Sequence, residues 1–161
     1  MKKAIITGTF DPVTVGHLDV IKRAVAIFDE VHVCVLNNGE KRTMFTADER
    51  LRIMEAAVEE IPGNIIVSSF GGLTSDYMKE HGITCIVKGV RNSTDFDYEY
   101  GIAEIMKKFL PGCETVLLPS APEYIHVSST FVREILKYGG PLEDAVPAGA
   151  VRVIKEIREL H

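Results

Sequence analysis

The stretch that decides the fold is "GTFDPVTVGH", residues 8–17, which follows an apolar run at residues 4–6. A segment with helical spacing begins directly after it. A connection from a strand to a helix needs only a chain breaker and a capping residue. This connection carries threonine, aspartate, histidine and two glycines. The turn therefore carries more polar groups than a connection of this kind requires.

Composition indicates an ordinary globular protein with one domain over residues 1–161. The chain is 46% hydrophobic and 25% charged, with a formal net charge of −5. This balance argues against nucleic acid as the main partner. The apolar run behind Lys2 and Lys3 is too short for a membrane span or a signal-peptide core, so we expect a cytoplasmic protein without a membrane partner.

The metal-ligating residue types are scattered, so no protein-held metal site is expected. Cys34, Cys85 and Cys113 lie far apart and lack ligand spacing. We expect them to be reduced, structural thiols. The remaining single histidines also form no metal-ligand pair; they are His32, His81, His126 and His161.

Short, β-branched apolar runs predict the strands. They cover residues 3–7, 31–36, 64–69, 83–88 and 114–119. Several are almost continuously apolar, which is typical of strands covered on both faces. Such strands favour a parallel sheet.

Segments with helical spacing separate the strands. The first covers residues 17–28, and the second begins with a capping box formed by Thr46 and Glu49. The others cover about residues 73–81, 95–110, 128–138 and 148–160. The alternation predicts an α/β fold: a single doubly wound, Rossmann-like domain with a five-stranded parallel sheet and helices on both faces. Ligands of such folds bind at the carboxyl ends of the strands, where the polar clusters of this chain also fall.

Two interpretations of the opening turn remain. Gly8 lets the backbone approach a ligand, and the helix amides after Gly16 suit a phosphate group at which His17 would point. Alternatively, Thr14 caps the helix and His17 is an ordinary residue of its first turn. That second interpretation leaves Thr9 unexplained.

The polar residues that follow two later strands also allow both a functional and a structural interpretation. Gly89 and Arg91 could hold a triphosphate, although an arginine is more commonly a solvated surface charge. Ser128 and Ser129 open a helix, where hydroxyls cap the helix, bind phosphate oxygens, or do both. No Walker motif, GxGxxG motif or GxSxG elbow is present, so kinase, dehydrogenase and serine hydrolase functions lack their signatures.

Residues 8–17 resemble the T/HxGH signature of the nucleotidyltransferase α/β phosphodiesterase superfamily. The ten-residue form is most similar to that of its phosphopantetheine adenylyltransferase family. Residues 40–46 (EKRTMFT), 88–99 (KGVRNSTDFDYE) and 127–134 (VSSTFVRE) resemble further blocks of this family. Two positions depart from the usual pattern of the family: Val15 replaces an asparagine, and Lys88 replaces an arginine. The second change matters because lysine cannot make the planar bidentate contact that arginine makes.

The resemblance implies an enzyme of coenzyme A biosynthesis that transfers the adenylyl group of ATP to 4'-phosphopantetheine. The products are dephospho-coenzyme A and pyrophosphate, and Mg²⁺ is bound through the ATP phosphates. A phosphate oxygen attacks, already ionised at neutral pH, so direct in-line transfer needs neither a base nor a covalent intermediate. Family members commonly form homohexamers, which implies a homo-oligomer.

The resemblance also implies roles for individual residues. His17, Thr9 and Lys41 are the catalytic residues. The substrate-binding set is Thr9, Lys41, Thr74 and Lys88, with the turn at residues 71–72 along the pantetheine arm. The ATP-binding set is Thr9, Phe10, His17, Gly89, Val90, Arg91, Glu99, Tyr124, Ile125, His126, Val127, Ser128, Ser129 and Thr130. Tyr98, Tyr100 and Met106 are interpreted as core or interface residues.

Two other functions remain open. One is a related nucleotidyltransferase that adenylylates nicotinate mononucleotide or cytidylylates glycerol phosphate, although the RTEGIST-type block of the cytidylyl branch is missing. The other is a noncatalytic nucleotide sensor on the same scaffold. The presence of Thr9, His17 and Lys41 together disfavours the sensor.

Overall fold

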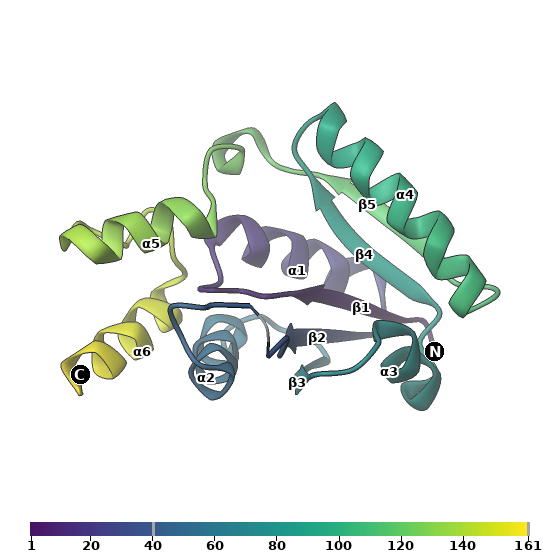
Figure 1. Ribbon diagram of the computed structural model, residues 1–161, viewed down its shortest axis with the longest axis horizontal. Coiled ribbons are helices and arrows are strands. Elements are labelled where there is room, and N and C mark those ends of the chain that lie inside the picture. Colours follow the sequence, from purple (N-terminus) through teal and green to yellow (C-terminus); the bar gives the residue numbers. More distant parts are fainter. Residues whose placement is uncertain (40, 161) are drawn as a thin grey trace.

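A parallel five-stranded sheet forms the centre of the computed structural model, which describes residues 1–39 and 41–160 (Figure 1). Glu40, the first residue of the predicted loop 40–46, and His161 lie outside the described residues. The strands are β1 (Lys3–Gly8), β2 (Glu30–Leu36), β3 (Ile65–Phe70), β4 (Cys85–Val90) and β5 (Glu114–Pro119). Their order is β3-β2-β1-β4-β5, and every neighbouring pair is parallel.

Helices alternate with the strands as predicted, and the last two helices follow β5. They are α1 (Val15–Ile27), α2 (Ala47–Val58), α3 (Thr74–His81), α4 (Ser93–Phe109), α5 (Ser129–Tyr138) and α6 (Ala148–Glu159). A 3₁₀ turn, η1 (Pro122–Tyr124), was not predicted. Two helices begin two residues earlier than expected because Thr14 and Asn92 cap them.

Local cap chemistry accounts for other helix ends. Thr46 and Glu49 form the predicted capping box of α2. Gly82 and Gly139 end α3 and α5 in the left-handed conformation, with φ of 66° and 73°. Glycine takes this conformation without the steric penalty of a Cβ atom.

Both faces of the sheet are buried, which confirms the doubly wound fold. On β1, Ala4 and Ile6 face the larger core, together with buried residues of α1, α2, α5 and α6. Ile5, between them, faces a second core that includes Tyr77 and Met78 of α3. This alternation follows from the two-residue period of a strand.

The sheet contains a switch point beside β1. The chain builds outward from β1 through β2 to β3, then returns to place β4 on the other side of β1. A crevice forms at the carboxyl ends of strands where the order reverses in this way. In Figure 1 the N-terminus lies at the opposite end of the sheet from α5 and α6.

The outer elements correct one expectation. No residue of α4 is buried, and Tyr98 and Tyr100 are 68% and 58% exposed, so the core interpretation is wrong for both. Met106 does pack against the second core. No helix in residues 1–39 and 41–160 is long and apolar enough to cross a membrane.

The cysteines are free thiols. Cys34 and Cys113 are buried and Cys85 is partly buried. Burial raises the pKa of all three thiols, so they are poor nucleophiles at neutral pH.

Candidate active site

A cavity of about 470 Å³ opens at the carboxyl ends of β1 and β4. This volume lies in the range that accommodates small-molecule ligands. Most of the predicted site residues line it: Thr9, Phe10, His17, Lys41, Lys88, Gly89, Arg91, Glu99, Tyr124, Val127, Ser128 and Ser129. The fold therefore brings together the opening turn, the loop before α2, the end of β4 and the start of α5.

The opening turn has a tightly folded backbone. Phe10 adopts a left-handed φ of 49°, which is uncommon for an aromatic residue. Its ring folds back over Gly8, where an added Cβ would lie 2.9 Å from the Phe10 ring. The same ring meets the His17 ring edge-on, with the centroids 5.0 Å apart. Phe10 therefore supports the histidine from the side.

Hydrogen bonds with Thr14 fix the orientation of His17. Thr14 is the N-cap of α1, and its Oγ1 accepts a hydrogen bond from the His17 backbone amide. The Thr14 backbone amide in turn donates to His17 Nδ1 over 3.0 Å. A backbone amide can only donate, so Nδ1 is unprotonated and the ring proton of neutral His17 is on Nε2.

The surroundings of His17 keep the ring neutral. Burial lowers its pKa from 6.5 to about 4, and the nearby positive charge of Arg91 acts in the same direction. At neutral pH the side chain is therefore a neutral donor through Nε2. The two interpretations of the turn are compatible, because the cap that completes the helix also aims the imidazole.

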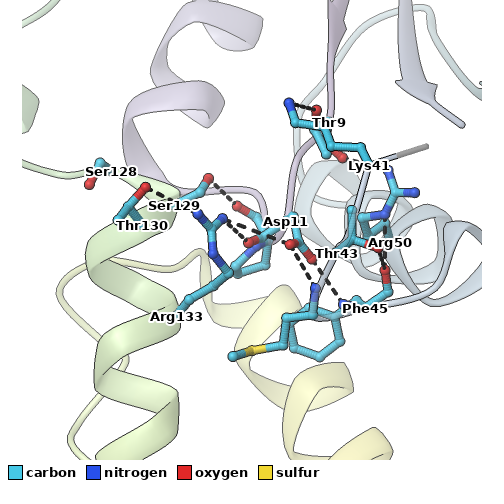
Figure 2. A network of polar contacts seen from close by, with 12 residues as sticks. Thr9, Asp11, Lys41, Thr43, Phe45, Arg50, Ser128, Ser129, Thr130 and Arg133 are labelled. Atoms are coloured by element: carbon cyan, nitrogen blue, oxygen red, sulfur yellow. Dashed lines mark hydrogen bonds and ion pairs between the residues drawn. The ribbon is translucent and has the colours of Figure 1, made fainter. Parts of the chain in front are cut away.

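Lys41 reaches the same turn from the loop before α2. Its Nζ donates a hydrogen bond to Thr9 Oγ1 over 3.2 Å, as Figure 2 shows. The Lys41 backbone amide donates to the Asn38 carbonyl over 3.0 Å. A cation and a hydroxyl thus lie side by side at the cavity wall.

A second cation enters the cavity from β4. Lys88 Nζ lies 4.0 Å from Glu99 Oε2, beyond hydrogen-bond distance. Within the part of the chain that the structure describes, Glu99 Oε2 is the one buried side-chain nitrogen or oxygen atom without a hydrogen-bond partner. Next to Lys88, Gly89 allows β4 to approach α1, since an added Cβ would lie 2.9 Å from a Val20 methyl group.

Comparisons with known proteins match this architecture. The cytidylyltransferase-like family model matches residues 5–135. A phosphopantetheine adenylyltransferase of Desulforudis audaxviator is 40% identical over 156 residues, which cover 97% of this chain and 95% of the relative. The chain belongs to the phosphopantetheine adenylyltransferase family. A relative of that name from Coprothermobacter proteolyticus is 40% identical over 99% of both chains. Another, from Lachnoclostridium phytofermentans, is 43% identical over 96% of this chain and 94% of the relative.

In this family member, a third cation lies beside the start of α4. Arg91 donates to Asp95 Oδ2 from its backbone amide over 3.1 Å and from Nε over 3.3 Å. Asp95 thereby orients the guanidinium through Nε. The arginine lines the cavity, and its side chain is 42% exposed, so both interpretations of this charge remain open.

The two serines at the start of α5 have different contacts. Ser128 is the N-cap, and its Oγ accepts from the Phe131 amide over 3.1 Å, which confirms the capping interpretation. Ser129 Oγ donates to the Pro12 carbonyl over 2.8 Å. This bond fastens the amino end of α5 to the opening turn, where the helix amides favour an anion.

The remaining predicted residues do not line the cavity. Thr74 is the first residue of α3, Val90 ends β4, and Ile125 and His126 follow η1. Thr130 lies in the first turn of α5, where its Oγ1 accepts from Arg133. Their ligand-binding roles stay predictions.

The cavity also contains polar residues that the sequence did not single out. They are Asp11, Thr43, Arg42, Asp95, Ser120 and Arg133. Asp11 lies in the quoted turn, and Arg133 lies in the VSSTFVRE block. The sequence could have indicated both residues as cavity residues only through their position in these two motifs.

Proposed function

We propose that this family member transfers the adenylyl group of ATP to 4'-phosphopantetheine and releases pyrophosphate. One observation carries the proposal: neutral His17, with its proton on Nε2, lies in a cavity that Lys41, Lys88 and Arg91 also line. A neutral donor among several cations suits phosphate groups whose charge increases during transfer. The family name of its relatives supports the same reaction.

The chemistry needs no general base. The attacking group is a phosphate oxygen that is ionised at neutral pH, so direct in-line attack on the α-phosphorus requires correct placement and charge stabilisation. His17 is unsuited to act as an acid because its pKa of about 4 leaves it neutral. Its Nε2–H stabilises oxygens of the α-phosphate as their negative charge grows.

The cations divide between the two substrates. Lys41 and Lys88 orient the incoming phosphate, with Thr9 beside Lys41. Arg91 and the amino end of α5, at Ser128 and Ser129, hold the β- and γ-phosphates. Lys41 lies in the loop before α2 and the two serines lie at the start of α5, whereas Lys88 and Arg91 both come from the end of β4, so the division between these two cations is the part that most needs a test.

Glu99 suits the nucleoside part of ATP. Its buried Oε2 lacks a donor within the described residues, and buried polar atoms are normally hydrogen-bonded. A ribose hydroxyl or the adenine amino group would supply that donor. Thr74 and the turn at residues 71–72, near the end of β3, would contact the pantetheine arm.

Mg²⁺ would be held by the nucleotide. Among residues 1–39 and 41–160, no three metal-ligating side chains cluster, and the Asp11 carboxylate already accepts backbone amides. This donor set fits an ion bound through phosphate oxygens, which Mg²⁺ commonly uses. When bound, the ion would neutralise phosphate charge.

We also propose a cytoplasmic homo-oligomer, with a hexamer as the expected form. Free thiols fit a reducing compartment. Exposed apolar side chains on α4, which has no buried residue, provide a surface for another copy: Phe96, Ile105 and Phe109 are each about half exposed. Light scattering in solution would test the assembly.

A pyrophosphate-release assay with three acceptors tests the proposed function. We expect release with ATP and 4'-phosphopantetheine, and little with nicotinate mononucleotide or glycerol phosphate. Release with one of the other acceptors would instead identify a related nucleotidyltransferase. ATP binding by calorimetry without release on any acceptor would identify a nucleotide sensor.

A further inference from the structure

A buried carboxylate holds the loop that carries Lys41. Asp11 is 4% exposed, and its oxygens accept hydrogen bonds from the backbone amides of Met44, over 2.8 Å, and Phe45, over 2.9 Å (Figure 2). Charge-assisted bonds of this kind are stronger than those between neutral groups. Asp11 therefore attaches the loop before α2 to the opening turn.

A buried guanidinium holds the same loop from the other side. Arg50 of α2 is 3% exposed, and its Nε donates to the Phe45 carbonyl over 3.2 Å. Its Nη1 donates to the carbonyls of Thr9, over 2.8 Å, and Leu36, over 2.9 Å. Both backbone polar groups of Phe45 are thus fixed, one by Asp11 and the other by Arg50.

These contacts converge on the Lys41 to Thr9 pair. Arg50 binds the backbone of Thr9, while Lys41 lies four residues before Phe45 and contacts the Thr9 hydroxyl. A lysine side chain is flexible and loses considerable conformational entropy when it is held in place. Fixing its loop in advance reduces the entropy lost when it binds a phosphate.

A third residue fixes Asp11 itself. Arg133 Nη1 donates to the Asp11 backbone carbonyl over 2.8 Å and lies 3.8 Å from its carboxylate. Arg133 belongs to α5, so Asp11 is held by an element other than the one it positions. The carboxylate can therefore serve as a fixed point for the loop.

We propose that Asp11 and Arg50 are positioning residues that hold Lys41 at Thr9 for the acceptor phosphate. This inference rests on the proposed function. Neither residue needs to touch a substrate for the role, because both act through the backbone of the Lys41 loop. Their loss should weaken use of phosphopantetheine much more than use of ATP.

Steady-state pyrophosphate release tests the inference with Asp11→Asn and Arg50→Lys. We expect each variant to raise the KM for phosphopantetheine about tenfold, in line with the loss of charge-assisted hydrogen bonds, with the KM for ATP changed less than about twofold. The matched controls are Asp144→Asn and Arg52→Lys, at exposed positions outside the cavity. Both controls should behave like the wild type.

Combination with Lys41→Ala separates positioning from a general structural role. If Asp11 and Arg50 act through Lys41, adding either substitution to Lys41→Ala raises the acceptor KM less than about twofold further. A full tenfold further rise, an equal rise in the ATP KM, an unchanged acceptor KM or loss of the melting transition would each overturn the inference. A wild-type enzyme that releases no pyrophosphate with phosphopantetheine would reject the proposed function itself.

Discussion

Two histidines in this protein have opposite hydrogen-bonding arrangements. His32, near the start of β2, is 2% exposed; its Nδ1 lies 2.9 Å from the Tyr77 hydroxyl and its Nε2 lies 2.8 Å from Glu30. His17, in the first turn of α1, uses Nδ1 to bind Thr14, and no hydrogen bond among the described residues involves its Nε2. One imidazole is fully committed to the fold, whereas the other retains a donor that lines a cavity.

The difference lies in how the two ring nitrogens of each histidine are used. Around His32 the partners are themselves bonded: Tyr77 contacts Ser68, and Glu30 contacts Lys3. The hydrogen bond with His32 is the largest cause of a lowered pKa for Glu30. His32 therefore closes a network, whereas His17 leaves one nitrogen available to a ligand.

The largest expected effect follows from removing the available nitrogen. His17→Ala should lower kcat by about 10²- to 10³-fold, as is typical for loss of one donor to developing charge. ATP affinity should change little, because the donor acts mainly in the transition state. Steady-state kinetics, calorimetry with ATP and a melting curve check this. Near-normal turnover with a lowered melting temperature would make His17 a structural residue like His32.

Lys41→Ala should produce the next largest effect. Loss of a charge-assisted contact to phosphate implies roughly a tenfold to hundredfold loss of phosphopantetheine affinity, with ATP affinity nearly unchanged. Calorimetry with each ligand separately measures both. Equal weakening for both ligands would remove Lys41 from the acceptor side of the cavity.

Lys88 should tolerate exchange for the arginine that is usual in the family. Its ammonium acts as a point charge, so Lys88→Arg should retain activity, while Lys88→Ala should raise the acceptor KM about tenfold. Acceptor titrations at saturating ATP measure these constants. Full activity of the alanine variant would show that the site needs no cation at this position.

His32→Ala should have the smallest effect on turnover and a clear effect on stability. It leaves Tyr77 and Glu30 without their shared partner, which should lower the free energy of unfolding by about 1–3 kcal/mol. Denaturant unfolding and steady-state kinetics measure the two quantities. A large loss of kcat without destabilisation would contradict the division between the two histidines.

The sequence predicted the features that depend on local patterns. Each strand was found because its apolar run is short and β-branched, and the end of α3 was marked by Gly82. The capping box of α2 was also predicted, because its two side chains are three residues apart. For His17, the sequence left cap and ligand contact as alternatives, and the structure shows that Thr14 caps the helix while its backbone amide orients the His17 ring.

Long-range hydrogen bonds could not be predicted in this way. Asp11 binds backbone amides 33 and 34 residues away, and Arg133 reaches it across 122 residues. These partners meet only after the sheet has formed and its carboxyl edge has assembled. Nothing in the local pattern around Arg50 indicates that it binds the carbonyl of Thr9, 41 residues away.

The most direct test of the account is the protonation state of His17, measured by ¹⁵N NMR against pH with His17→Ala used for assignment. We predict a neutral ring with its proton on Nε2 and no titration between about pH 5.5 and 8, since its pKa is about 4. An unfolded chain takes up this proton near its ordinary pKa of about 6.5. Proton uptake by His17 therefore favours the unfolded chain, and the free energy of unfolding falls as the pH decreases from 6.5 toward 4. Titration of His17 near pH 6.5, or a proton on Nδ1 at neutral pH, would contradict the central claim that this residue is a fixed neutral donor.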